Sequence, residues 1–292
     1  MISNLAMISV RSFVARYPVA SFLVMAHVIF WICWFPILFL AAPPRPFSAL
    51  GAILGLALPA FLVTGATEGR TGVRDLLRRT LRSRVGVGWY LFAVFAIPVG
   101  AVLLAALVLG VAPLQTLTRE WSLLVTVFLP HLVLAVVTVQ LFEEVAWSGL
   151  VQHRLQSRYG TLKATILVGV AFATIHLPTY LTVPLTAHQL LQVLVAQVVL
   201  IVPFAVLFRA LIAWTYNRTG FSVLLAAIVH ASFNTAAEII GPVVVDPSLA
   251  QILGVGVTAL LAVGAAVWSK GTLGYRREHS TTVVPTLQAN PD

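Results

Sequence analysis

Long apolar stretches separated by short polar breaks make up most of this chain. Eight apolar segments can be recognised, at residues 18–42, 47–66, 88–112, 123–150, 163–179, 189–214, 221–241 and 249–268. Proline and glycine breakers lie between them, as at Pro43-Pro44-Arg45-Pro46 and at Gly241-Pro242. A helix needs about 20 apolar residues to cross the hydrocarbon core of a bilayer. The pattern therefore predicts an all-α fold, a polytopic membrane bundle of about eight transmembrane helices.

The composition supports a membrane protein. Hydrophobic residues make up 60% of the 292 residues and charged residues only 9%, whereas soluble domains carry about 25% charged residues. We therefore expect one transmembrane domain at residues 1–269, with a core at about 120–240, in the cell membrane. The polar stretch 270–292 is predicted to be a disordered cytoplasmic tail. The single cysteine, Cys33, excludes an internal disulfide.

The net charge of +9 is spread over the breaks between apolar segments. With the N-terminus in the cytoplasm and eight spans, sixteen of the 18 lysines and arginines fall on the inner side. This count includes Arg209, which we expect to snorkel from the end of its span. Only Arg45 and Arg119 fall outside. Basic residues mark cytoplasmic loops, so both termini are predicted to be cytoplasmic, and the expected anionic partner is membrane lipid rather than nucleic acid.

Two local patterns predict details of the bundle. The segment 70–84 carries six arginines together with Leu76, Leu77 and Leu81 at near-helical spacing. This spacing predicts an amphipathic helix on the inner leaflet, chiefly a topological anchor. Gly51 and Gly55 form a GxxxG pair, which predicts close helix packing within the chain.

A few polar residues lie inside the apolar segments. An ionisable side chain inside a span costs at least about 2.5–3.5 kcal/mol, so each needs a reason. The residues concerned are Glu143 and Glu144 in the fourth segment, His176 in the fifth, and His230 with Asn234 in the seventh. At a rise of about 1.5 Å per residue, Glu143 and His176 both lie roughly 20 Å from the inner ends of their helices, and Asn234 roughly 18 Å. Three helices are thus predicted to present polar groups in one layer.

This set of side chains suits hydrolysis of an acyl bond. A carboxylate can act as general base, a histidine can polarise the same water, and a histidine with an amide can stabilise an oxyanion. His230 and Asn234 are four residues apart and share a helix face. Glu143 and Glu144 point about 100° apart, so one should face the cavity while the other hydrogen-bonds within the bundle. The spacing does not say which of the two is the base.

A metal site is the alternative use of the same residues. Zinc takes histidine and carboxylate ligands, and Glu143, His176 and His230 would be the ligands here. The HExxH pattern is absent from the chain. No cofactor is therefore expected, with zinc kept as the alternative.

Three motifs carry a resemblance to a known family. They read Glu143-Glu144-Val145-Ala146-Trp147-Ser148-Gly149, Phe172 to His176, and His230 to Asn234. In order and spacing they resemble the CAAX protease and bacteriocin-processing (CPBP, Abi) family of intramembrane endopeptidases. The resemblance implies that Glu143 with His176 activates water and that His230 with Asn234 forms the oxyanion hole. It also implies a membrane-embedded or lipidated peptide substrate, with prenylated CAAX-type proteins among the candidates, cut from a cavity open to the cytoplasm. Ser148 departs from the family's arginine.

The sequence thus predicts an intramembrane endopeptidase of the glutamate type. Ser148 motivates one alternative, a non-catalytic immunity or scaffold protein of the same family. A proton-coupled transporter is a further alternative, since intramembrane carboxylates and histidines also mark ion paths. The physiological substrate and the oligomeric state are not indicated by the sequence.

Overall fold

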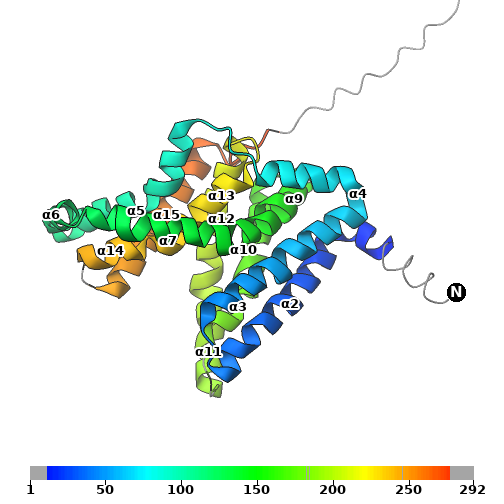
Figure 1. Cartoon of the computed structure of the whole chain (residues 1–292), viewed down its shortest axis with the longest axis horizontal. Coiled ribbons are helices and arrows are strands. Elements are labelled where there is room, and N and C mark those ends of the chain that lie inside the picture. The colour runs from blue at the N-terminus through cyan, green and yellow to red at the C-terminus, as the bar shows by residue number, and fades with distance from the viewer. Residues whose placement is uncertain (1–11, 182, 184, 245, 277–292) are drawn as a thin grey trace, which may run out of the picture.

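The computed structural model describes residues 12–181, 183, 185–244 and 246–276, and the helices among them are drawn in Figure 1. The N-terminal half contains α2 (Pro18–Leu40), α3 (Pro44–Leu50), η1 (Gly51–Ala57), α4 (Leu58–Thr80), α5 (Val87–Leu109), α6 (Ala112–Arg119), η2 (Leu124–Phe128), α7 (Leu129–Ala135), η3 (Val136–Gln140) and α8 (Leu141–Glu144). The C-terminal half contains η4 (Val145–Gln152), α9 (His153–Tyr159), α10 (Thr161–Ile175), η5 (Leu177–Tyr180), α11 (Ala187–Ala196), η6 (Gln197–Ile201), α12 (Val202–Arg218), α13 (Val223–Thr235), α14 (Ala237–Val244) and α15 (Pro247–Trp268). Most of the predicted tail, residues 277–292, lies outside the described residues.

Each of the eight predicted apolar segments contains a helix. Within the described residues, seven helical runs are long and apolar enough to cross a membrane, and α10 is a shorter apolar helix that matches the fifth segment. Several short elements join into longer runs, Pro44–Thr80, Leu124–Tyr159 and Ala187–Arg218. The prediction of an all-α polytopic bundle is therefore confirmed, and the protein is a multi-pass membrane protein.

Small residues bring neighbouring helices close together. A Cβ atom on Gly55 would lie 2.9 Å from the backbone nitrogen of Phe30, and one on Gly51 would lie 3.1 Å from the Phe30 ring. The GxxxG pair therefore lets η1 pack directly on the backbone of α2, as close packing within the chain predicts. Gly169 has the same role between α10 and α12, since its Cβ would lie 2.7 Å from the Cα of Val206.

The arginine-rich segment forms the last turns of α4. The helix bends at Gly69, whose φ of 64° and ψ of −156° are not helical, and glycine adopts this conformation without strain. Beyond the bend, the chain runs across the end of the bundle (cyan in Figure 1). Leu76 is buried there, whereas Leu77 and Leu81 are exposed. The predicted amphipathic helix is therefore present up to Thr80.

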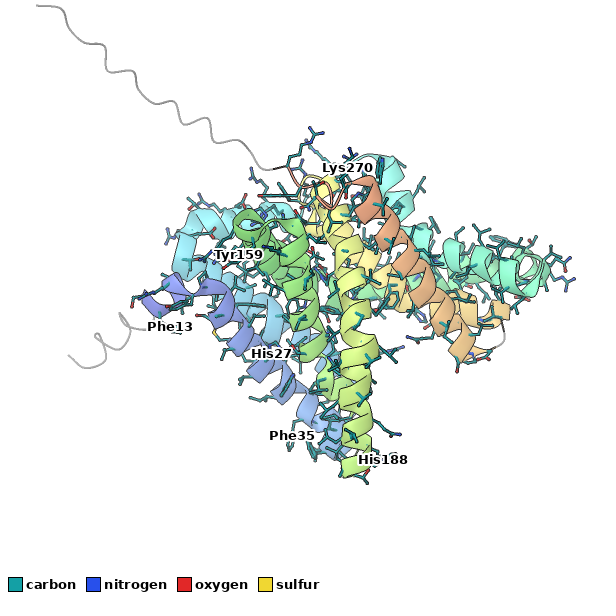
Figure 2. The ribbon with its side chains drawn as sticks, turned by 180° about the vertical axis from the view of Figure 1, so that it is seen from behind. Phe13, His27, Phe35, Tyr159, His188 and Lys270 are labelled. Carbon is teal, nitrogen blue, oxygen red and sulfur yellow. The ribbon has the colours of Figure 1, made fainter. Side chains whose placement is uncertain are left out.

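The bundle has two chemically different ends. Lys270 and Tyr159 lie at one end in Figure 2, and Phe35 and His188 lie at the other. We call the first the basic end, because the loops and helix ends around Arg78, Arg82, Arg158, Arg218 and Lys270 meet there. The second, where α2 passes into α3 at Arg45, is called the α3 end. The helix α10 starts beside Tyr159 at the basic end and has His176 at its other end.

Candidate active site

Four helices supply the polar residues inside the bundle. Glu143 and Glu144 end the single turn α8, and the flanking turns η3 and η4 are π-helical. Such π-bulges change the direction in which side chains leave a helix and are frequent at functional sites. His176 caps the end of α10, and His230 and Asn234 lie on α13. The structure thus brings all five predicted residues to one region, although their roles stay predictions.

Glu144 is fully buried and is bound on both of its oxygens. Its Oε1 accepts a hydrogen bond from Arg209 Nη1 at 2.5 Å and one from His230 Nδ1 at 2.9 Å. Its Oε2 accepts from Ser148 Oγ at 2.5 Å and from Arg209 Nη2 at 3.0 Å. This two-pronged geometry is the strong form of an arginine–carboxylate pair. Glu144 has no oxygen left for substrate or water.

Arg209 corrects one prediction from the sequence. We expected it to snorkel from the end of its span, but its side chain is completely buried and paired with Glu144. It also donates to Ser148 Oγ at 3.0 Å and lies over the Phe172 ring. The depth of Arg209 in its helix could have been predicted from the sequence, because the residue lies nine residues, roughly 13 Å, before the helix end at Arg218. A buried arginine at that depth requires an acidic partner.

Arg209 supplies the positive charge that the first motif lacks at its own arginine position. Ser148 stands at that position, and its hydroxyl bridges Glu144 and Arg209. The positive charge beside the second glutamate is therefore supplied by α12 instead of by the glutamate's own helix. Sequence inspection within the motif could not find it, since 65 residues separate Arg209 from Glu144.

Each of the two histidine rings is oriented by a hydrogen bond between its Nδ1 atom and an acceptor oxygen. His176 Nδ1 lies 2.7 Å from the carbonyl oxygen of Phe172, four residues earlier. His230 Nδ1 faces the Glu144 carboxylate. Carbonyl and carboxylate oxygens only accept, so both rings carry a proton on Nδ1. Each therefore keeps Nε2 for other chemistry, and His230 Nε2 lies 3.8 Å from Glu143 Oε2.

Glu143 differs from its neighbour. Its side chain is only slightly exposed, and its Oε2 is buried with no hydrogen-bond partner among the described residues. A buried carboxylate oxygen without a partner is costly, so this oxygen is a natural place for a water molecule. Glu143 is thus the carboxylate of the pair that faces open space.

Two cavities meet at Glu143. A small one of about 180 Å³ is lined by Glu143, His176, His230 and Asn234 together with aromatic rings, among them Phe172 and Phe208. A larger one of about 570 Å³ shares Glu143, His176 and Asn234 and extends to residues of α3 and α14. Asn234 is exposed to this space. The polar residues therefore stand at the junction of a narrow aromatic pocket and a wider channel.

The larger cavity lies towards the α3 end. Its lining includes Arg45 and Pro46 of α3, Trp34 near the end of α2, and Glu238 of α14. Glu238 lies 3.5 Å from His131 Nδ1, which also lines the cavity. The family resemblance implied a cavity open to the cytoplasm. The residues that line the larger cavity lie towards the α3 end, and the side of the membrane on which it opens stays a prediction.

The other polar residues near the layer have structural contacts. His27 bonds the Leu23 carbonyl oxygen and Thr174 Oγ1. Gln152 donates to Gln156 and Thr165. These contacts join α2, η4 and α10 without reaching the cavity, so they hold the helices that carry the site.

In the part of the chain that the structure describes, no three His, Cys, Asp or Glu side chains are grouped so that they could hold a metal ion. Glu144 is occupied by Arg209 and His230, while Glu143 and His230 stand 3.8 Å apart. Glu143, His176 and His230 all line the small cavity.

Comparison with known proteins supports the motif reading. Residues 125–236 match the family model described as type II CAAX prenyl endopeptidase Rce1-like. All three motifs fall inside this stretch, as does Arg209. No curated protein matches the chain. The match agrees with the family that the motifs predicted and supports a CAAX-type protease role at the level of the family.

Proposed function

On the premise that residues 125–236 are a type II CAAX prenyl endopeptidase Rce1-like segment, we propose that this protein is an intramembrane endopeptidase that hydrolyses a peptide bond of a membrane-associated substrate. The observation that carries the proposal is the contrast within the glutamate pair. Glu144 is bound on both oxygens, whereas Glu143 turns an unpaired oxygen to the cavities. One carboxylate is thus left for chemistry and the other for positioning.

Glu143 and His176 activate the water. Glu143 takes a proton from a water molecule in the small cavity, and the hydroxide adds to the carbonyl carbon of the scissile bond. The Nε2 of His176 accepts a hydrogen bond from the same water and orients it. Glu143, now a carboxylic acid, returns the proton to the leaving nitrogen as the carbon–nitrogen bond breaks. No cofactor takes part in this sequence, and the protein begins and ends in the same protonation state.

His230 and Asn234 stabilise the oxyanion of the tetrahedral intermediate. The Asn234 amide donates from the cavity wall. The His230 ring, which Glu144 fixes through Nδ1, turns Nε2 towards the same oxyanion. Preorganised donors of this kind are often the largest single contribution to catalysis. Glu144 and Arg209 are positioning residues, because they act by fixing the His230 ring.

The same arrangement weakens the case for an inactive relative. That alternative rested on Ser148 in place of an arginine, and Arg209 now supplies a guanidinium to the same carboxylate. The serine at this position therefore does not leave Glu144 without a positive partner. The hydrolytic reading is therefore preferred.

The orientation of the bundle in the membrane determines from which side a substrate can enter the larger cavity. Basic loops mark the cytoplasmic side, so we place the basic end and both termini in the cytoplasm. The larger cavity then opens towards the outer half of the membrane, because it reaches Arg45 at the α3 end. A substrate that enters there comes from the bilayer or from the outer side. Peptides anchored by a lipid or by an apolar segment fit the apolar walls of this cavity, and prenylated peptides are among them.

The first test is cleavage of a quenched-fluorescent farnesylated CAAX peptide by the full-length protein in detergent. Wild type and Glu143→Ala are compared, each with and without a chelator. Turnover that is lost in the variant and kept with chelator supports the glutamate mechanism. Turnover lost with chelator would mean that Glu143, His176 and His230 hold a metal ion. Equal turnover by wild type and variant would refute the proposal.

The substrate is tested separately by comparing the cleavage rates of three peptides. They are the farnesylated peptide, the same peptide with an unmodified cysteine, and a transmembrane peptide whose scissile bond lies at the outer end of its single span. Preference for the farnesylated peptide supports a CAAX-type substrate. Preference for the single-span peptide supports a substrate that enters from the outer side.

A further inference from the structure

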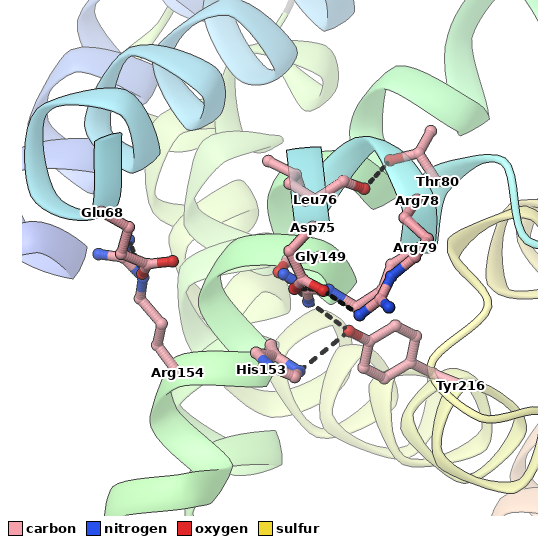
Figure 3. Close-up of polar contacts among 10 residues, drawn as sticks. All are labelled: Glu68, Asp75, Leu76, Arg78, Arg79, Thr80, Gly149, His153, Arg154 and Tyr216. Carbon is pink, nitrogen blue, oxygen red and sulfur yellow. Dashed lines mark hydrogen bonds and ion pairs between the residues drawn. The ribbon is translucent and has the colours of Figure 1, made fainter. Parts of the chain in front are cut away.

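A separate cavity with polar walls lies at the basic end, away from the two cavities of the proposed active site. It has a volume of about 570 Å³, and its lining includes Arg78, Arg79 and Arg82 of α4 and its following loop, His153 of α9, and Arg276. The proposed peptidase reaction uses none of these residues. Figure 3 shows the polar contacts on its floor.

The charges in this cavity are not balanced. Asp75 is the one carboxylate in the lining, against four guanidinium groups. It is already used, since it accepts from Arg78 Nη2 at 2.5 Å and from Arg79 Nε at 2.8 Å. Arg82 and Arg276 form no ion pair with any described residue. Within the described part of the chain, two positive charges thus face the cavity without a carboxylate partner.

The floor of the cavity is rigid and preorganised. Arg79 is 8% exposed and donates from Nη1 to the Gly149 carbonyl and to Tyr216 Oη, both at 2.8 Å. Tyr216 Oη lies 3.2 Å from His153 Nδ1 (Figure 3). These contacts tie α4, η4, α9 and α12 together. A buried, hydrogen-bonded arginine is the mark of a built site rather than of a solvated charged surface.

Gly220 makes room for Arg82. Its φ is 66°, and a Cβ atom there would lie 2.8 Å from the Arg82 guanidinium. Any other residue would be strained and would push Arg82 out of its place. The glycine therefore leaves space for the Arg82 guanidinium beside the loop after α12.

We propose that this cavity binds the phosphate group of an anionic phospholipid. Phosphate is the anion that a planar guanidinium recognises through paired hydrogen bonds. The cavity lies at the basic end, where our orientation places the anionic headgroups of the inner leaflet. Leu77 and Leu81 on the same segment are 43% and 70% exposed, and they would contact the acyl chains beside the bound headgroup.

The cavity is connected to the proposed active site through two helices. Arg79 holds the carbonyl of Gly149, five residues after Glu144 on the same helical run. It also holds Tyr216, seven residues after Arg209 on α12. A phosphate that fixes this corner of α4 therefore steadies both helices of the Glu144–Arg209 pair. We expect phospholipid binding to raise the thermal stability of the protein.

The test uses full-length protein in nanodiscs of phosphatidylcholine, with and without one-fifth phosphatidic acid. Binding is measured as retention of a fluorescent phosphatidic acid, and stability as the midpoint of thermal unfolding. The variant is Arg82→Gln with Arg276→Gln, whose side chains are exposed at the cavity edge. The matched control is Arg158→Gln with Lys163→Gln, which removes the same charge at the same end outside the cavity.

We expect the cavity variant to bind about 100-fold more weakly or worse, because each lost hydrogen-bonded contact with the charged phosphate costs about tenfold or more, and the control to change much less. The gain in unfolding temperature from phosphatidic acid should disappear only in the cavity variant. An equal loss in both variants would overturn the proposal, because general charge attraction would then explain the binding. Folding is checked by equal midpoints in pure phosphatidylcholine.

A competition experiment with a water-soluble phosphate identifies the source of the bound phosphate group. Competition by glycerol phosphate is measured against the fluorescent lipid. Displacement only by lipid supports a phospholipid headgroup. Equal displacement by glycerol phosphate at the same concentration would overturn the lipid assignment in favour of a soluble phosphate.

Discussion

The Arg209–Glu144 pair and the Arg78–Asp75 pair have the same nitrogen–oxygen distance, 2.5 Å, in opposite surroundings. Both side chains of the first are fully buried, whereas those of the second are 80% and 37% exposed. Breaking a buried pair leaves a charge without solvent, which costs about 3–5 kcal/mol. An exposed pair contributes about 0–1 kcal/mol. Two ion pairs with the same distance therefore differ in their contribution to the free energy of unfolding. The buried pair is the one that stabilises the site.

The largest effect is expected for Arg209→Met. The change leaves Glu144 as an uncompensated buried charge, so the free energy of unfolding should fall by about 3–5 kcal/mol and activity should disappear. Reversible unfolding in detergent measures the first, and peptide cleavage measures the second. The double variant Arg209→Met with Glu144→Met should recover most of the stability without recovering activity. Failure of the double variant to recover stability would mean that the pair is not the source of the loss.

A somewhat smaller effect on the reaction is expected for Asn234→Ala. Loss of one oxyanion donor lowers kcat by about 10²–10³-fold, and stability should hardly change, because Asn234 is exposed to the cavity. Steady-state kinetics on the cleaved peptide give kcat and KM separately. Asn234→Asp is the matched control for size, and it should be as slow as the alanine variant. An unchanged kcat with a raised KM would instead make Asn234 a substrate-binding residue.

Ser148→Ala should have an intermediate effect on stability. The hydroxyl bridges a charged pair, and a hydrogen bond to a charged group contributes about 1.5–3 kcal/mol. Because Arg209 still holds Glu144 by two contacts, activity should fall much less than in Arg209→Met. The readouts are the unfolding free energy and the cleavage rate of one preparation. Complete inactivation would show that the serine has a role beyond this bridge.

The smallest effect is expected for Arg78→Gln at the basic end. The pair with Asp75 is exposed, and Asp75 keeps Arg79 as a partner. Stability should change by less than about 1 kcal/mol, with any change reduced further at high salt. Thermal unfolding at low and high ionic strength checks this. A loss as large as that of Arg209→Met would contradict the contrast between the two pairs.

Much of the fold could be predicted from the sequence, because the signal is local. Among the described residues, apolar length locates the seven helical runs that are long enough to cross a membrane and the shorter α10, and Gly51 with Gly55 indicates a close helix contact that the structure contains. The depth calculation was also useful, since Glu143, His176 and Asn234 line one cavity. Periodicity and helical rise are properties of a single segment, so one sequence suffices to apply them.

The contacts between helices could not be predicted in the same way. The partner of Glu144 is set by how α12 is rotated against α8, and no local pattern encodes that rotation. For the same reason helical spacing left Glu143 and Glu144 equivalent, and only the family resemblance favoured Glu143. In the structure, Glu143 is the one of the two that lines the cavities. The larger cavity is lined by residues of α3, α7 and α14, and which helices enclose it is again a property of packing.

The central claim is that Glu143 performs the chemistry while Glu144 positions His230. Its most direct test compares Glu143→Gln with Glu144→Gln, both in single-turnover cleavage and in thermal unfolding. We expect Glu143→Gln to unfold at or above the wild-type temperature and to show no turnover, because it loses only an unpaired carboxylate. Glu144→Gln should unfold at a clearly lower temperature, since Arg209 loses its counter-charge. Turnover by a folded Glu143→Gln protein would contradict the account.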